Sequence, residues 1–242
     1  MNVESTVQQL RTLRLNGMAQ SYQSFADMPS HQQLDAHTLI AQLAEAEAYH
    51  RLDNRMKILL RMSKLRYAAT LEQIVCSEQR NLSKEMLLVL HNDMYIKKGQ
   101  NVLITGPTGV GKSYLACALG HQACCLGYKV AYLNGSFFID RIQNSKLDGS
   151  YHRIINYYQK IDLLIFDDFG LYPLTQDIKL TLLKLLEDRY AKRPVIITSQ
   201  LPIKNWFDFI NDPTIADAIM DRLLAKNHRI ELKGESMRKN QF

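Results

Sequence analysis

The stretch NVLITGPTGVGKSYL, residues 101–115, decides the fold. Asn101–Thr105 is short and apolar, as a buried strand requires. A loop with three glycines follows, and a helical pattern then runs to about Gly127. Gly106–Ser113 matches G-x-x-x-x-G-K-[ST] in full. In a strand–loop–helix unit of this kind, backbone N–H groups and a helix N-terminus surround phosphate oxygens. The stretch therefore predicts a site for a nucleoside triphosphate.

The residue types in this loop fit that chemistry. Glycine allows positive φ and a close approach of the backbone to the phosphates. A lysine supplies a point charge to the β- and γ-phosphates, and a serine hydroxyl is a ligand for Mg²⁺. Ser113 is thus a predicted Mg²⁺ ligand. The residues predicted to bind ATP are Gly106, Pro107, Thr108, Gly109, Val110, Gly111, Lys112, Ser113 and Tyr114.

A second apolar strand, Leu163–Phe166, ends in two carboxylates, Asp167 and Asp168. Four consecutive apolar residues suit a central strand that is buried on both faces. Ligands bind at the carboxyl ends of strands in open α/β sheets. Asp167 is therefore expected to hold Mg²⁺, largely through water. Asp168 is expected to act as a general base on the attacking water, although capping of the next turn is the other interpretation.

Polar residues also end the strand Val195–Thr198, where Ser199 and Gln200 follow. Either could orient the attacking water or sense the γ-phosphate, and ordinary turn chemistry before Pro202 fits equally well. Arg222 lies on a predicted helix, Thr214–Leu224. It is either a surface ion-pair residue or an arginine finger that reaches a neighbouring subunit. The same two interpretations remain open for Arg238.

The order of elements predicts two domains. From Asn101 on, strands alternate with helices, which indicates a parallel sheet covered on both faces. The remaining strands are expected at residues 130–133 and 230–232. Residues 1–66 are expected to be helical, with a capping box at Ser5–Gln8, a weakening near Gly17 and a long helix from Asp35. An apolar stripe on that helix is predicted at Leu39, Leu43, Ala46, Tyr49, Leu52, Met56 and Leu59. Residues 67–100 are interpreted as a linker and residues 101–242 as the nucleotide-binding domain.

The charge pattern leaves two interpretations open for the end of the long helix. The net charge is +6, and between residues 51 and 66 six cations face one anion, Asp53. This face is either solvated or in contact with the phosphates of DNA. The cations, which are the predicted DNA-binding residues, are Arg51, Arg55, Lys57, Arg61, Lys64 and Arg66.

Other features of the sequence exclude several classes of protein. Hydrophobic residues make up 46% of the chain and charged residues 22%, as in globular proteins. No run of 18 apolar residues occurs, and the N-terminus MNVESTVQQL has no signal-peptide pattern, so a cytoplasmic location is expected. The four cysteines do not have the spacing of a zinc site and are expected to be buried: Cys76, Cys117, Cys124 and Cys125.

With these motifs in hand, the chain resembles the IstB family, the AAA+ ATPase helpers of insertion-sequence transposition, which are related to helicase loaders of the DnaC type. DDFGL at 167–171, TSQLP at 198–202 and RIELKGES at 229–236 are more specific to the family than the phosphate loop. The likeness extends over LRTLRLNGMAQSY at 10–22, DPTIADAIMDRL at 212–223 and the stretches already quoted. The resemblance implies an α/β P-loop NTPase (AAA+) three-layer fold after a small all-helical N-terminal domain. Since ten residues follow Leu232, the C-terminal lid is expected to be largely absent.

The resemblance also implies roles. Asp167 and Asp168 would form the Walker B pair, Gln200 or Ser199 sensor I, Arg222 the finger acting in trans and Arg238 sensor II. The helical domain would bind duplex DNA, and ATP would drive homo-oligomer assembly on it to assist a transposase. Other hypotheses remain: a helicase loader of the DnaC type, a small-molecule kinase on the same scaffold, and an ATP-switched scaffold that does not hydrolyse.

Overall fold

The computed structural model describes residues 2–29 and 35–237. The chain divides into two compact units, Met1–Ile58 and Leu59–Phe242. The helices of the first unit are α1 (Val3–Thr12), α2 (Asn16–Ala26) and the start of α3 (Ala36–Ser63). The division falls within α3, and each unit is described by itself. Among the described residues, no helix is long and apolar enough to cross a membrane.

The helix ends of the first unit correct two predictions. Asn2, not Ser5, caps α1, since the Ser5 N–H donates to Asn2 Oδ1 at 2.8 Å. A capping box at Ser5–Gln8 was therefore wrong, because Ser5 already lies inside the helix. The break comes before Gly17, where Arg14 has a φ of 60°. The long helix begins as expected, with Asp35 Oδ1 accepting from the His37 N–H at 3.0 Å.

Gly17 lets α2 pack closely on α3. A Cβ at Gly17 would lie 2.5 Å from the Ala46 carbonyl oxygen and 2.7 Å from Glu47 Cα. Glu47 Oε2 accepts the Gly17 N–H at 2.8 Å and the Met18 N–H at 3.2 Å. Burial opposes the charge of this carboxylate, but Arg51 and the two amides lower its pKa in the net balance. A buried acid at a helix N-terminus thus joins the two helices.

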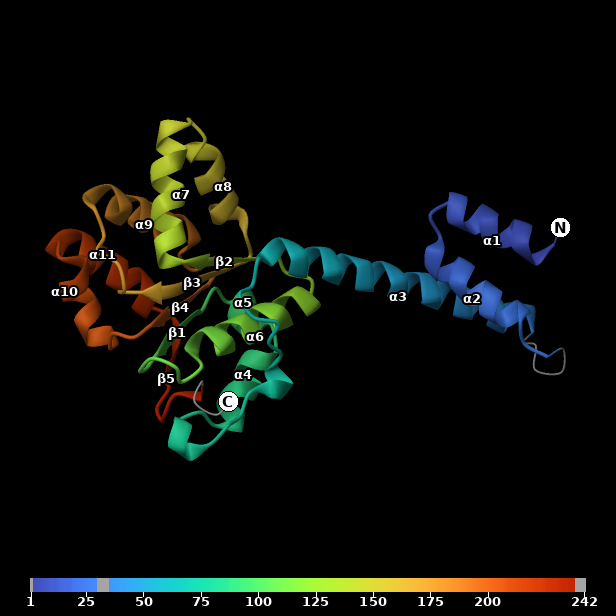
Figure 1. Ribbon diagram of the computed structural model, residues 1–242, viewed down its shortest axis with the longest axis horizontal. Helices are drawn as coiled ribbons and strands as arrows, with labels where there is room; N and C mark the ends of the chain where they lie inside the picture. The colour runs from blue at the N-terminus through green and yellow to red at the C-terminus, as the bar shows by residue number, and fades with distance from the viewer. Residues whose placement is uncertain (1, 30–34, 238–242) are drawn as a thin grey trace. The chain divides into compact units, whose positions relative to one another are not determined.

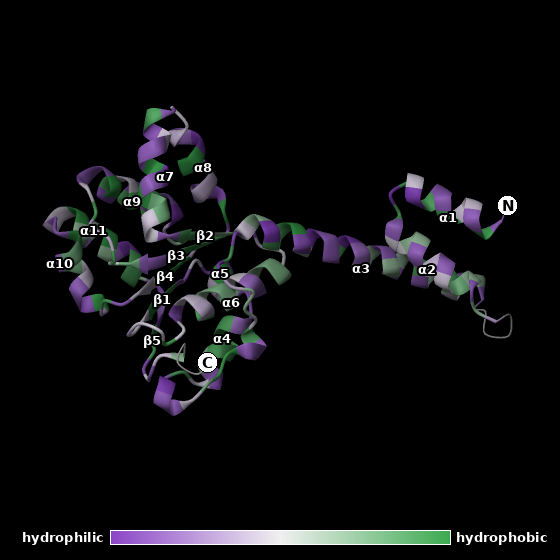
Figure 2. Ribbon diagram, viewed as in Figure 1, coloured by the Kyte–Doolittle hydropathy of each residue, from purple (hydrophilic) through white to green (hydrophobic). Residues whose placement is uncertain are grey.

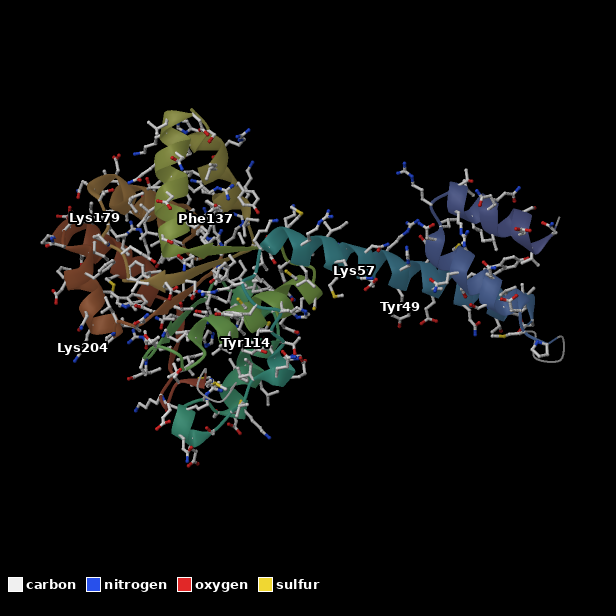
Figure 3. All side chains as sticks on the ribbon, in the orientation of Figure 1. Tyr49, Lys57, Tyr114, Phe137, Lys179 and Lys204 are labelled. Carbon is white, nitrogen blue, oxygen red and sulfur yellow. The ribbon has the colours of Figure 1, made fainter. Side chains whose placement is uncertain are left out.

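The predicted apolar stripe on α3 is only partly buried. Tyr49 and Leu52 are 64% and 62% exposed, whereas Leu59 is buried at 7%. Figure 2 shows the middle of α3 in hydrophilic colours, and Figure 3 shows the Tyr49 and Lys57 side chains standing off this helix. The helical period was predicted correctly, but the stripe is exposed at Tyr49 and Leu52, where no described residue covers it.

The second unit is built on a five-stranded parallel sheet, in the order β2-β3-β4-β1-β5 (Figure 1). Its strands are β1 (Asn101–Thr105), β2 (Val130–Asn134), β3 (Leu163–Phe169), β4 (Val195–Ser199) and β5 (Asn227–Glu231). Its helices are α4 (Lys84–His91), α5 (Met94–Lys97), α6 (Lys112–Cys125), α7 (Gly135–Leu147), α8 (Tyr151–Lys160), α9 (Gln176–Arg189), α10 (Trp206–Ile210) and α11 (Pro213–Leu224), with short 3-10 turns at η2 (Leu71–Gln73), η3 (Glu78–Arg80) and η4 (Ile203–Asn205).

Because side chains alternate along each strand, the core consists of two layers, one on each face of the sheet. Val102 and Ile104 of β1 pack with α6 on one face, and Leu103 between them packs on the opposite face with α7–α11. Successive side chains of a strand point to opposite faces, so a sheet covered on both sides needs apolar residues at every position. The three-layer α/β fold is thereby confirmed, and the carboxyl ends of β1, β3 and β4 lie at one edge.

Several boundaries differ from the predictions. β3 continues to Phe169 and so includes both aspartates, and β5 begins at Asn227 rather than at residue 230. The stretch 67–100 is folded into the second unit, where η2 and α4 contact α6. Cys117 and Cys124 are buried as expected, but Cys76 is only half-buried and Cys125 is exposed.

Candidate nucleotide site

The loop between β1 and α6 has the backbone geometry of a phosphate cradle. Gly106, Gly109 and Gly111 have φ angles of 144°, 86° and 94°, which disfavour residues with a Cβ. At Gly106 a Cβ would lie 2.3 Å from the Leu232 carbonyl oxygen, so this glycine is also required by the chain that follows β5. Gly111 leads directly into the N-terminus of α6, where free N–H groups favour an anion.

Lys112, the first residue of α6, is held over the loop. Its ammonium donates to the Pro107 carbonyl oxygen at 2.8 Å, and the residue is only 6% exposed. This cation also lies near enough to favour the charged form of Asp168. The loop therefore carries a buried positive charge next to the acidic strand, as a triphosphate site requires.

Asp167 joins the loop to the sheet. Its side chain is fully buried, and the Ser113 hydroxyl donates to Asp167 Oδ1 at 2.8 Å. The Thr198 hydroxyl donates to the same oxygen and the Tyr132 phenol to Oδ2. Burial, followed by this hydrogen bond, raises the pKa of Tyr132, so the phenol stays protonated and donates.

The oxygens of Ser113 and Asp167 also fit a magnesium ion. Mg²⁺ takes oxygen ligands, retains several waters and is commonly held by one or two protein groups beside the phosphates. Within the described residues, no cluster of three acidic, histidine or cysteine side chains could hold a metal ion. The Ser113 hydroxyl and the Asp167 carboxylate, in contact beside the loop, could supply two oxygen ligands to such an ion.

Asp168 occupies a strained position beside Asp167. Its φ is 61°, in the left-handed region that side chains other than glycine seldom adopt. Burial raises the pKa of its carboxyl group, and the neighbouring Asp167 charge raises it further. Asn134 at the end of β2 donates to Asp168 Oδ2 at 2.9 Å. A partly buried carboxylate with a raised pKa, fixed by an amide, is suited to accept a proton.

Arg66 lies beside the same acidic pair. Its Nη1 is 3.9 Å from Asp167 Oδ2 and 3.8 Å from Asp168 Oδ2, and the guanidinium stacks 5.3 Å from the centre of the Tyr67 ring. Since α3 ends at Ser63, Arg66 is not on the helix face to which the sequence assigned it. The structure places this predicted DNA contact at the acidic pair.

Of the two candidates at the end of β4, Ser199 and Gln200, Gln200 contacts the phosphate loop. The Thr108 hydroxyl donates to Gln200 Oε1 at 2.8 Å. Ser199 is fully buried, and its hydroxyl donates to the Phe169 carbonyl oxygen at 2.6 Å and accepts the Leu201 N–H. Ser199 thus stabilises the local turn, whereas Gln200 is hydrogen-bonded to the phosphate loop.

These motifs agree with what is known of related proteins. A model of the IstB-like ATP-binding protein family matches residues 8–242. The chain belongs to this family. It is 39% identical over 241 residues to the insertion-sequence ATP-binding protein y4pL of Sinorhizobium fredii, covering 100% of this chain and 98% of that protein.

Solved structures confirm the AAA+ fold. AMPPCP-bound DnaA of Aquifex aeolicus superposes with a TM-score of 0.60 at 21% identity, over 72% of this chain and 53% of that one. DnaI superposes with a TM-score of 0.60 at 16% identity, over 73% and 94%. At such identities the likeness concerns the fold alone. The IstB-like chain is therefore an insertion-sequence ATP-binding protein with the fold that DnaA and DnaI share.

The IstB-like site contains residues that the sequence analysis missed. Asn134 ends the otherwise apolar strand β2, as Asp167 follows the apolar start of β3, so the same pattern could have found it. Tyr132 and Thr198 lie within strands and gave no signal. Arg80 comes from a distant 3-10 turn and donates to the Val110 carbonyl oxygen of the loop at 2.8 Å.

The IstB-like chain also packs its last described residues on the loop. The Met237 N–H donates to the Gly109 carbonyl oxygen at 3.0 Å, and a Cβ at Gly109 would lie 2.1 Å from Ser236 Oγ. Arg238, the sensor II candidate, lies outside the described residues. Tyr114 contacts the former linker, where its hydroxyl donates to Gln73 Oε1 at 2.8 Å and its ring packs on Tyr67.

Arg222 is paired within its own subunit. Its guanidinium donates to the Glu187 carboxylate and the Ala218 carbonyl oxygen, each at 2.7 Å. Both α9 and α11 belong to the layer opposite α6. On α3, Arg51 pairs with Glu47 at 2.8 Å and Lys57 with Asp53 at 2.6 Å. These arginines and lysines of the IstB-like chain keep surface positions suited to ion pairs.

Proposed function

We propose that this IstB-like protein hydrolyses ATP with Mg²⁺, assembles with further copies on duplex DNA and prepares that DNA for the transposase of the same insertion sequence. The observation that carries the hydrolytic part is the 2.8 Å hydrogen bond between Ser113 Oγ and Asp167 Oδ1. It brings the phosphate loop and the acidic strand into one site.

The site residues have complementary roles in this proposal. Backbone N–H groups of Gly106–Gly111 and the Lys112 ammonium bind the phosphates. Ser113 and Asp167 would hold Mg²⁺, which would supply charge neutralisation. Asp168 accepts the proton of the attacking water as its oxygen bonds to the γ-phosphorus. The bond from that phosphorus to the β–γ bridging oxygen breaks, which releases ADP and phosphate. Gln200, held by Thr108, orients the water.

Assembly and DNA binding use residues outside this site. We propose that Arg222 exchanges Glu187 for the γ-phosphate of a neighbouring subunit, as an arginine finger in trans. The DNA-binding face comprises Arg51, Arg55, Lys57 and Arg61 on α3. In functional terms, the helices of the first unit serve DNA binding, residues 67–100 pack on α6 within the second unit, and residues 101–242 carry the ATPase site.

Lys112→Ala tests the nucleotide dependence of this assembly. The variant loses a charge-assisted contact to phosphate, so ATP affinity should fall by about 10- to 100-fold and ATP-dependent sedimentation with duplex DNA should disappear. Lys129→Ala, an exposed lysine outside the loop, is the matched control. Retention of assembly in Lys112→Ala would argue against an ATP-driven complex.

A helicase loader of the DnaC type is the second candidate, since DnaI has the same fold over 73% of this chain. The full-length match to an insertion-sequence protein favours transposition instead. Co-purification separates the two: the first proposal requires a stable complex with the transposase on DNA, whereas a loader would bind the replicative helicase.

A further inference from the structure

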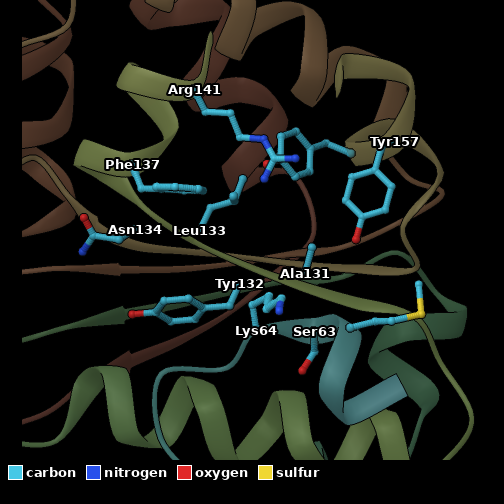
Figure 4. A pocket seen from close by; sticks show the side chains of 11 residues that line it. Ser63, Lys64, Ala131, Tyr132, Leu133, Asn134, Phe137, Arg141 and Tyr157 are labelled. Carbon is cyan, nitrogen blue, oxygen red and sulfur yellow. The ribbon is translucent and has the colours of Figure 1, made fainter. Parts of the chain in front are cut away.

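A cavity of about 360 Å³ lies along the free edge of β2, away from the phosphate loop. Its walls come from residues 62–64 at the end of α3, from β2 itself, and from α7 and α8. All of them belong to the second compact unit. Figure 4 shows Phe137, Arg141 and Tyr157 on one side of β2, with Ser63 and Lys64 on the other.

Aromatic rings and cations dominate this cavity. Phe137 and Tyr157 are 53% and 37% exposed, so flat apolar faces are open to a ligand. The Arg141 guanidinium lies 5.7 Å from the centre of the Phe137 ring and 5.5 Å from that of Tyr158. Lys64, at a φ of 56°, is the second lining cation. Rings and guanidinium together form a surface on which a planar π-system can stack.

No carboxylate lines this cavity, although the described residues that form it include two cations. Within the described part of the chain, neither Lys64 nor Arg141 has an acidic partner within ion-pair distance. The two cations favour an anionic ligand, and the aromatic rings favour a ligand with a flat group.

The volume of the cavity limits the ligand to one small molecule or group. Ligand cavities range from about 300 to 1,000 Å³, so this one lies near the lower limit. Two residues of its wall also reach the nucleotide site: Tyr132 donates to Asp167 and Asn134 to Asp168. A ligand in the cavity therefore rests against side chains that hold the acidic pair.

We propose that this cavity binds a single unstacked nucleotide of DNA, with its base against Phe137 and Tyr157 and its phosphate between Arg141 and Lys64. The proposal rests on the DNA binding proposed above and extends it to a specific site. Stacking on aromatic side chains and cations along the phosphates is how proteins bind unpaired nucleotides. An acidic peptide would satisfy the cations but would leave the exposed rings without a flat partner, so the nucleotide fits better.

A duplex with one bulged 2-aminopurine, compared with the fully paired duplex, tests this site on the full chain. Wild type should bind the bulged duplex about 10-fold more tightly and quench the probe, because the base stacks on protein rings. Phe137→Leu keeps apolar bulk without a π-face and should abolish the preference, as should Arg141→Ala. Phe137→Tyr retains a ring and should preserve it.

The controls separate this site from the wider proposal. Arg153→Ala and Phe207→Ala change exposed residues outside the cavity and should bind both duplexes as wild type does. Equal affinity of wild type for both duplexes, or an unchanged preference in Phe137→Leu and Arg141→Ala, would overturn the cavity proposal and leave duplex binding intact. Failure of wild type to bind either duplex would overturn both the cavity proposal and the proposed DNA binding. Competition by a glutamate-rich peptide, with no probe quenching, would assign the cavity to a protein partner and overturn it as well.

Discussion

Asp168 shows at the scale of one residue how the demands of the site oppose stability. It combines a φ of 61° with a partly buried charge next to Asp167. Backbone strain and raised pKa values both cluster at functional sites, where the rest of the fold must compensate for them. The pKa of Asp168 is raised chiefly by burial, so the folded protein disfavours the ionised form that a general base requires.

Asp168→Asn should therefore stabilise the nucleotide-free protein while slowing ATP hydrolysis by roughly 10²- to 10⁴-fold. Asparagine tolerates the left-handed backbone and removes the charge. Because the folded pKa is raised, the ionised carboxylate costs stability above that pKa. The gain in melting temperature should be full at neutral pH and should fade as the pH falls through the raised value towards 3.8. A lower melting temperature at pH 7.5 would contradict this.

Arg66 should shift the pH dependence of hydrolysis. Its guanidinium favours the charged form of Asp168, so Arg66→Ala should raise the pKa of that carboxyl group. The base then stays protonated to higher pH, and the acidic limb of the pH–rate profile should move upward. Arg66→Lys keeps the charge and serves as the control. An acidic limb at the same pH in wild type and Arg66→Ala would mean that Arg66 does not act on Asp168.

At the scale of elements, the sequence was most informative where local pattern and chemistry coincide. Gly106–Ser113 and the apolar start of β3 before Asp167 were predicted because a glycine loop and a run of four apolar residues each indicate few other structures. β5 was placed three residues late, since Asn227, His228 and Arg229 are polar and pair with β1 only through the backbone. The packing of residues 67–100 on α6 was missed because those contacts are tertiary.

Gly17→Ala tests the packing of α2 on α3. The added Cβ would lie 2.5 Å from backbone and cannot be relieved by moving a side chain, so a cost of about 1 to 3 kcal/mol is expected. Hydrogen exchange should increase in α1 and α2, while ATP affinity stays unchanged. Gly17→Ser should be at least as destabilising, since it adds the same Cβ. Unchanged exchange in both variants would show that α2 can move away from α3 at little cost.

At the scale of the whole molecule, Arg222 tests whether hydrolysis needs a second copy of the chain. Its partners here are Glu187 and Ala218, so loss of the side chain should not affect the phosphate loop of its own subunit. Arg222→Ala should keep ATP affinity within about twofold and slow turnover by roughly 10³-fold. Mixing it with Asp168→Asn, which has an intact arginine but no base, should restore part of the activity. If mixing the two variants restores no activity, Arg222 does not act in trans.

The central claim is that the loop at Gly106 and the acid at Asp167 form one magnesium-dependent site. Titration calorimetry with a non-hydrolysable ATP analogue, with and without Mg²⁺, tests it most directly on wild type and Asp167→Asn. We predict one nucleotide per chain, tighter binding with Mg²⁺ in wild type, and loss of that magnesium effect in Asp167→Asn. No nucleotide uptake by wild type, or the same magnesium effect in both proteins, would contradict the account.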